Sequence, residues 1–172
     1  TKDNDFTWDE FQTRNNNELV AIYGNFINRV LVLTHKYYGG IVPEAGNLNP
    51  VDQIVLDEMA LLPQKMGLAI EQYRFREASQ ILMQLARLGN KYLANAEPWK
   101  LIKTDAERVA TIMHTALQIA AGLSILSEPI LPFTAKKLTK MLQLDSKNLN
   151  WKGVSEASTL IDTGHQIGEA SL

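Results

Sequence analysis

Apolar residues recur along this chain three and four positions apart, which is the spacing of amphipathic helices. Two stretches show the pattern most clearly. Their apolar stripes consist of Phe75, Ala78, Ile81, Leu82, Leu85, Leu88 and Tyr92 in the first, and of Ile112, Ala116, Ile119, Leu123 and Leu126 in the second. No segment of useful length alternates polar and apolar residues as a strand does. The pattern predicts an all-α protein, an antiparallel bundle of about five helices followed by a less regular C-terminal tail.

Capping residues and glycines mark the expected helix ends near the N-terminus. Thr7 and Glu10 have the spacing of a capping box and predict the start of a short helix. The asparagines at 15–17 are expected to interrupt that helix, and the first of them to cap a long helix that runs to about residue 38. The glycine pair at 39–40 is expected to end the long helix, because glycine tolerates the left-handed conformation found there.

Prolines mark most of the remaining boundaries, because proline lacks a backbone N–H and clashes with the preceding helical turn. Asn49 is expected to cap a helix that Pro50 begins, and Pro63 to kink or break that helix. The later boundaries are expected at Pro98 after the third helix, at Thr104 with Glu107 at the start of the fourth, and at Pro129 and Pro132 before a last helix through Met141. Residues 1–144 are thus predicted to form the helical domain and residues 145–172 the tail.

The composition is typical of one globular domain: 172 residues, 45% of them hydrophobic and 21% charged. The absence of cysteine excludes disulfides, thiolate nucleophiles and zinc ribbons, and it suits a reducing cytosol. No apolar run is expected to span a membrane, and the first residues have no signal-peptide pattern. We therefore expect a cytoplasmic protein that does not bind a membrane. The chain lacks an initiator methionine and stops abruptly at Leu172, which is typical of a fragment.

The net charge of −2 argues against a protein that binds nucleic acid mainly by charge. Affinity of that kind grows with the number of phosphates that are neutralised. An RNA-binding protein with this charge therefore has to use base stacking and base-edge hydrogen bonds, or be tethered to a second part that binds.

Catalytic and metal-binding motifs are not found. The three histidines, His35, His114 and His165, are scattered, and none follows a glutamate at the spacing that di-iron bundles require. There is no phosphate-binding glycine loop, no nucleophile elbow and no cluster of metal ligands. His114 lies in a strongly apolar stretch and is expected to be a hydrogen-bonded core residue. We predict neither a catalytic centre nor a metal site in this chain.

One narrow polar stripe runs along the otherwise apolar long helix predicted before residue 38. It consists of Glu18, Asn25, Arg29, Val32 and Lys36. Asn25 and Arg29 are four residues apart and so are neighbours on a helix surface. An amide beside a guanidinium presents several donors and one acceptor in a fixed arrangement, which is how proteins read a base edge. Spacing alone favours the simpler interpretation, a solvated face of a bundle helix.

A tryptophan follows the proline that ends the third predicted helix. Pro98 prevents helix continuation and holds Trp99 at the start of the next loop. Tryptophan offers a large face on which an unpaired base can stack. Taken by itself, Trp99 is more often the cap of a bundle core than a stacking platform.

Three separated pieces of the chain occur together in a recognisable order. They are Gly24-Asn25-Phe26-Ile27-Asn28-Arg29 on the long helix, Gly89-Asn90-Lys91-Tyr92 followed by Ala96-Glu97-Pro98-Trp99, and a helix that ends in the run from Leu126 to Phe133. In this order the chain closely resembles the C-terminal anticodon-binding domain of methionyl-tRNA synthetases, from about residue 5 to residue 168. The resemblance implies an all-helical fold that recognises the CAU anticodon of the methionine tRNA.

The resemblance also implies roles for particular residues. Trp99 would stack on the first anticodon base, a cytosine, while Asn25 and Arg29 would hydrogen-bond to base edges and Pro98 would fix the loop. Asn90 would support the loop that holds Trp99. Lys36 and Lys100 are possible supporting residues that would add positive charge near the reading face.

The same resemblance makes the chain one part of a methionine–tRNA ligase. Its partners would be the methionine tRNA and the enzyme's own catalytic domain, towards which residues 145–172 would return. The fragment itself would need no cofactor, whereas the whole enzyme would use ATP and Mg²⁺, with any structural zinc ion in the catalytic half. We expect the fragment to be monomeric.

Two other interpretations remain open at this point. One is the helical domain of another class I synthetase, such as those for isoleucine, valine, leucine or cysteine. The other is a helical module that binds protein and no RNA, which predicts that Trp99 is buried.

Overall fold

The structure, a computed structural model, describes residues 7–145, 150–156 and 159–170. The described part of the chain is helical, apart from its connecting loops and one isolated β-bridge. The elements are α1 (Trp8–Arg14), η1 (Asn15–Gly24), α2 (Asn25–Tyr38), α3 (Pro50–Glu71), α4 (Phe75–Ala96), α5 (Pro98–Leu101), α6 (Ala106–Leu126), α7 (Pro132–Met141) and α8 (Trp151–Ser155). The predicted all-α fold is confirmed.

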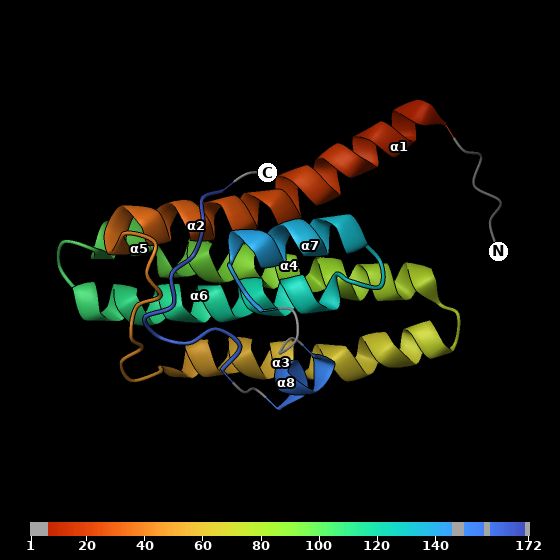
Figure 1. Ribbon diagram of the computed structural model, residues 1–172. Helices are drawn as coiled ribbons and strands as arrows, with labels where there is room; N and C mark the ends of the chain where they lie inside the picture. The colour runs from red at the N-terminus through yellow and green to blue at the C-terminus, as the bar shows by residue number, and fades with distance from the viewer. Residues whose placement is uncertain (1–6, 146–149, 157–158, 171–172) are drawn as a thin grey trace.

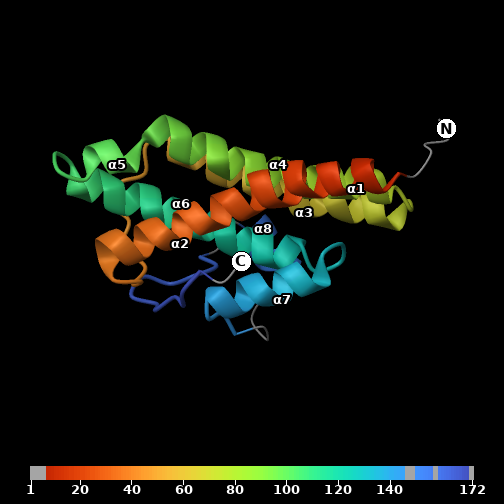
Figure 2. The ribbon, with the colours of Figure 1, turned by 90° about the horizontal axis from the view of Figure 1, so that it is seen from above.

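The first three elements form one continuous rod along the top of the bundle, and α1 projects past its end (Figure 1). Seen from above, the rod has α4 on one side and α7 on the other (Figure 2). α3 and α4 form an antiparallel hairpin, and α6 packs against α2, α3, α4 and α7. α5 is a short turn at the end of the bundle opposite to α1 (Figure 1).

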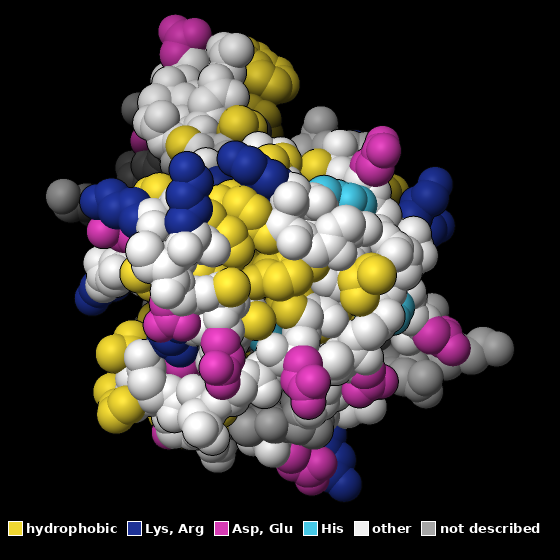
Figure 3. Space-filling model, turned by 90° about the vertical axis from the view of Figure 1, so that its left-hand side faces the viewer, with side chains coloured by type: hydrophobic (Ala, Val, Ile, Leu, Met, Phe, Trp, Pro, Cys, Tyr) yellow, Lys and Arg dark blue, Asp and Glu magenta, His cyan; other side chains and the backbone are white. Residues whose placement is uncertain are grey.

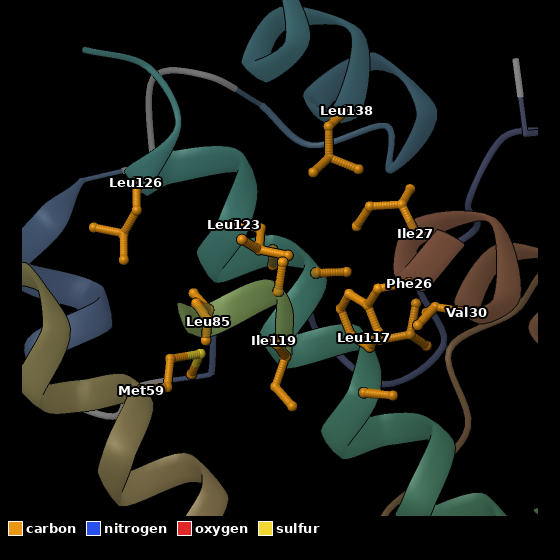
Figure 4. Packing of buried hydrophobic residues seen from close by; sticks show 14 of the residues in the cluster. Phe26, Ile27, Val30, Met59, Leu85, Leu117, Ile119, Leu123, Leu126 and Leu138 are labelled. Carbon is orange, nitrogen blue, oxygen red and sulfur yellow. The ribbon is translucent and has the colours of Figure 1, made fainter. Parts of the chain in front are cut away.

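The centre of the hydrophobic core is α6, in which every residue from 115 to 126 is buried. Leu117, Ile119, Leu123 and Leu126 of this helix meet side chains of the surrounding helices (Figure 4). Those side chains include Phe26, Ile27 and Val30 of α2, Met59 of α3, Leu85 of α4 and Leu138 of α7. A helix surrounded on all sides has to be apolar around its whole circumference.

The expectation that no apolar run reaches the length of a membrane span was wrong for α6, by length and composition only. Its 21 residues are long and apolar enough by length and composition, with a mean hydropathy of 1.6 in the most apolar stretch. That stretch is 89% buried inside the protein, so the same residues serve here as the core of the bundle.

Several predicted helix ends are confirmed. The backbone N–H of Glu10 donates to Thr7 Oγ1 at 3.2 Å, as a capping box requires. Gly39 ends α2 in the left-handed conformation, with φ of 61°. Asn49 caps α3, accepting from the backbone N–H of Asp52 while the Asp52 carboxylate accepts from the N–H of Asn49.

Two local predictions were wrong, and a third was wrong in part. The asparagines at 15–17 do not interrupt the helix, because the chain continues through them as the π-helical segment η1. Pro63 does not break α3, which runs on to Glu71, and the buried neighbours Met59 and Met66 hold this helix against the core. The alternative outcome, a kink at Pro63, stays a prediction. The cap of α6 is not Thr104 but the next residue, Asp105, whose carboxylate accepts from the Arg108 N–H at 3.0 Å.

The C-terminal tail returns along the bundle. Gln118 of α6 holds it, donating to the Ile161 carbonyl at 2.8 Å and accepting from the Leu160 N–H at 2.8 Å. Farther on, an isolated antiparallel bridge pairs Ile41 with Gln166, beside the loop after α2. The described part of residues 145–172 is therefore packed onto the helical domain.

Candidate nucleic-acid interface

The corner between α4 and α5 places Trp99 at the surface. Glu97 adopts the left-handed conformation, with φ of 44° and ψ of 53°, which turns the chain out of α4. Pro98 then starts α5, where its missing N–H leaves no hydrogen bond unmade. Pro98 is buried, whereas Trp99 is 38% exposed. The proline anchors the corner and the indole remains partly open to solvent.

Arg29 and Trp99 meet across the bundle end. The Cζ atom of Arg29 lies 5.0 Å from the centroid of the Trp99 ring, which is a cation–π contact. The two residues come from α2 and α5, which are far apart in the sequence. The structure thus brings together two of the residues that the sequence predicted for one site.

Asn25 is the first residue of α2 and is exposed one turn away from Arg29. Its side-chain Nδ2 donates to Asn90 Oδ1 of α4 at 3.2 Å. The Nδ2 of Asn90 donates in turn to the carbonyls of Ile22, at 2.8 Å, and Ala86, at 3.1 Å. These bonds tie Asn90 to Asn25, to the end of η1 and to its own helix α4, and the expected support of the loop that holds Trp99 stays a prediction.

The supporting lysines lie on the surface near this end. Lys36 is on the exposed stripe of α2, with its Nζ 5.6 Å from the Tyr37 ring centroid. Lys100 pairs with Glu97 at 2.7 Å, so part of its charge is already neutralised. Figure 3 shows this end of the molecule: hydrophobic side chains gather at its centre, with Lys and Arg side chains along the upper border and Asp and Glu side chains below. Positive charge is therefore local rather than spread over the face.

Glu18 does not lie on the narrow stripe that carries Asn25 and Arg29. It forms an ion pair with Arg87 of α4 at 3.2 Å. An α-helical period over the whole rod would place Glu18 on that stripe, but the i→i+5 hydrogen bonds of η1 make wider turns and change the angular position of residues before Gly24.

A buried ionic network that was not predicted from the sequence ties α3, α4 and α6 together. The fully buried carboxylate of Asp52 accepts from both terminal nitrogens of Arg108, at 2.5 and 2.7 Å, and from the Tyr92 hydroxyl at 2.6 Å. Burial acts to raise the pKa of Asp52, but the hydrogen bonds from Arg108, Tyr92 and Asn49 outweigh it, and the net pKa is lowered. Burial and the neighbouring carboxylate raise the pKa of Tyr92. The only sequence signal was a helix-capping aspartate, which does not reveal its distant partners.

The expected hydrogen bonding of His114 is confirmed, although the residue is half-buried rather than part of the buried core. Its Nδ1 lies 2.9 Å from the Pro43 carbonyl and its Nε2 lies 3.1 Å from Gln118 Nε2. A carbonyl only accepts, so Nδ1 carries the proton and Nε2 accepts from the glutamine amide. Among the residues that the structure describes, no three His, Asp or Glu side chains come together as metal ligands would.

Comparison with known proteins identifies two parts of the chain. A family model of the anticodon binding domain of methionyl tRNA ligase matches residues 42–171, and a model of class I tRNA synthetases (M) matches residues 1–31. Asn25 and Arg29 lie in the second match, whereas Pro98 and Trp99 lie in the first. The candidate site is therefore assembled from both.

Similar proteins agree with this division. The methionine–tRNA ligases of Christiangramia forsetii and Flavobacterium psychrophilum are 61% and 59% identical over the whole of this chain. The chain covers only 26% and 25% of those proteins, about a quarter of their length. The methionyl-tRNA synthetase of Mycobacterium tuberculosis, solved in complex with methionyl-adenylate, superposes with a TM-score of 0.90 over 96% of this chain and 33% of its own. At 20% identity that likeness shows the fold alone. On the family match, this chain belongs to the family of anticodon-binding domains of methionyl-tRNA ligases.

Proposed function

We propose that this domain recognises the CAU anticodon of the methionine tRNA. The observation that carries the proposal is the contact between Arg29 and Trp99, 5.0 Å from Cζ to ring centroid, on the same bundle end as Asn25. A stacking platform, a guanidinium and an amide at one end of the bundle would suit a single unpaired loop. These are the groups with which proteins recognise single-stranded RNA.

Each residue has a separate part in the proposed complex. The Arg29 guanidinium lies over one face of the indole, which is 38% exposed, and the first anticodon base, cytosine, stacks on the exposed part of the ring. Asn25 and Arg29 hydrogen-bond to base edges, and Pro98 keeps the α4–α5 corner rigid. Lys36 and Lys100 supply local positive charge for the phosphates.

The weak overall charge sets the expected strength of binding. A chain with a net charge of −2 gains little from phosphate neutralisation, so the isolated domain should bind weakly and discriminate mainly by contacts to bases. In the whole enzyme, tethering to a catalytic part that also holds the tRNA raises the effective concentration of the anticodon at this site.

The whole protein, on this proposal, is a cytoplasmic ligase that attaches methionine to its tRNA with ATP and Mg²⁺, both bound by its catalytic part.

Exposed aromatic residues mark where the catalytic part of the whole protein would contact this domain. Trp8 and Phe11 on α1, and Tyr73 and Phe75 at the α3–α4 turn, are each about half exposed or more. They lie at the end of the bundle opposite to α5 (Figure 1), and α1 falls in the segment that matches the class I synthetase model. A contact there would leave Trp99 free for the anticodon.

The test is a titration of the domain with three anticodon stem-loops that differ only in the first anticodon base. Binding is measured from the change in tryptophan fluorescence. The CAU stem-loop should bind more tightly than the other two, by about 1–3 kcal/mol. Trp99→Ala should weaken CAU binding by about 1–3 kcal/mol through the lost stack. Trp8→Ala is the matched control, because Trp8 is on the far end of the bundle and its removal should leave the affinity unchanged. Equal affinity for all three stem-loops would refute the proposal.

The two remaining interpretations have less support. The family model that matches residues 42–171 is that of methionyl tRNA ligase. A protein-binding module with a capped core predicts a buried Trp99, but the indole is 38% exposed.

A further inference from the structure

We infer that Asn90 is the positioning residue that determines which edge of Asn25 faces the RNA. The inference rests on the proposed function and adds a specificity-determining residue to it. Asn90 itself is half-buried on α4 and is set to act through Asn25.

The orientation of the Asn90 amide is determined by its neighbours. Carbonyl oxygens accept and never donate, so the amide atom that contacts the carbonyls of Ile22 and Ala86, at 2.8 and 3.1 Å, has to be the nitrogen. A flip of the amide would bring its oxygen against two carbonyl oxygens. The Oδ1 of Asn90 is therefore held towards α2.

The fixed oxygen of Asn90 orients Asn25 in turn. Only the Nδ2 of Asn25 can donate to it, and the two atoms are 3.2 Å apart. Asn25 is then left with its carbonyl oxygen and one N–H for an RNA base, in one spatial order. An exposed asparagine without this bond would rotate about its last side-chain torsion, which has a broad and roughly two-fold profile, and would present either order. The bond thus converts a group that matches several base edges into one that matches fewer.

The backbone around this pair is also held at close range. The Ile22 carbonyl lies near the point where η1 gives way to α2, just before Asn25. Beside Asn90, a Cβ atom added at Gly89 would lie 2.5 Å from the Phe26 ring, so α4 approaches α2 as closely as a glycine allows. The distance between the two amides is therefore set by helix packing and not by flexible side chains.

The experiment is a double-mutant cycle on the complete domain, with Asn90→Leu, Asn25→Ala and the double variant. Each is titrated with the CAU stem-loop and with stem-loops changed at one anticodon base. Asn90→Leu should reduce the preference for CAU at one position about three- to tenfold, the effect of one hydrogen bond. In the Asn25→Ala background the same change should have less than about a twofold effect, because the residue through which Asn90 acts is gone. The matched control is Gln84→Ala, an exposed amide on the same helix.

A second readout needs no RNA. The ¹⁵N–¹H nuclear Overhauser effect of the Asn25 side-chain amide should be that of a rigid group in the parent domain and of a mobile one in Asn90→Leu. A full loss of preference that persists in the Asn25→Ala background, or an Asn25 amide with the same mobility in both proteins, would overturn the inference. If the parent domain shows no anticodon preference, the proposed function fails. The mobility of the Asn25 side-chain amide then tests by itself whether Asn90 positions Asn25.

Discussion

Three side chains make up the candidate site. Asn25 and Arg29 supply its hydrogen-bonding groups, and Trp99 supplies its aromatic ring. Arg29 is engaged with the Trp99 ring, and Asn25 with Asn90. Both retain groups for RNA: the guanidinium has five N–H donors in a planar fork, and the asparagine keeps an acceptor and a donor. At the scale of residues, these contacts preorganise the candidate site and leave polar groups open for the proposed contacts to RNA.

Two substitutions of Arg29 should distinguish the contribution of its positive charge to RNA binding from that of its planar guanidinium group. Arg29→Gln should relax the preference at the base that Arg29 contacts, by about 1–3 kcal/mol if the contact is bidentate. Arg29→Lys keeps the charge but loses the planar fork, so it should also lose the preference while it keeps more of the total affinity. Stem-loop titrations at two salt concentrations measure both quantities. Retention of full preference in Arg29→Lys would show that charge alone acts.

The helices bring these residues together because their packing distances are short and specific. α4 meets α2 through Gly89, where the Phe26 ring occupies the space that a side chain would need. Gly67 on α3 has a different environment, since an added Cβ would make an ordinary contact of 3.7 Å with Trp151. At the scale of elements, one helical glycine sets a helix–helix distance and the other does not.

Alanine at these two glycines should therefore have opposite effects on stability. Gly89→Ala overpacks the α2–α4 contact and should lower the free energy of unfolding by about 1–3 kcal/mol. Gly67→Ala improves helix propensity without a clash and should raise it by about 0.5–1 kcal/mol. Chemical denaturation monitored by circular dichroism measures both. A Gly89→Ala variant as stable as the parent would mean that the α2–α4 contact tolerates a wider spacing.

The molecule as a whole depends on a buried ionic network at the bundle end that carries α5. Asp52, Tyr92 and Arg108 link three helices, and no other ion pair in the described part of the chain includes a fully buried carboxylate. Breaking such a pair leaves a buried charge without a partner, which is strongly destabilising. The network therefore ties the stability of the bundle to pH.

The domain should lose stability in acid because of Asp52. Its pKa is lowered from the ordinary value of 3.8, so the unfolded chain binds a proton at Asp52 more readily than the folded one does. The contribution to stability is fully present above the unfolded pKa and is lost as the pH falls through the folded pKa. Denaturation midpoints between about pH 6 and pH 2 measure this loss. Asp52→Asn should be less stable than the parent at neutral pH and should show a smaller decrease in acid; an equal decrease would assign the acid sensitivity to other carboxyl groups.

Local sequence patterns were sufficient to predict most helices and several of their ends. Hydrophobic periodicity depends on one helix at a time, and caps such as Asn49 or Gly39 act through bonds within a few residues. Two of the failures are stop signals that the structure overrides. Pro63 and the asparagines at 15–17 carry local signals to stop, but tertiary packing and the wider turns of η1 carry the helix through them.

The candidate site divides in the same way. The sequence determined by itself that Asn25 and Arg29 are neighbours, since a four-residue spacing on a helix places two side chains on one face. Only the tertiary structure decided three further features: the contact of Arg29 with Trp99, the hydrogen bond from Asn25 to Asn90, and the Asp52 network. These contacts join residues 40 to 70 positions apart, and no local periodicity specifies which face of one helix meets which face of another. That choice is made by the packing of the whole core around α6, in which all the helices have to bury their apolar faces at once.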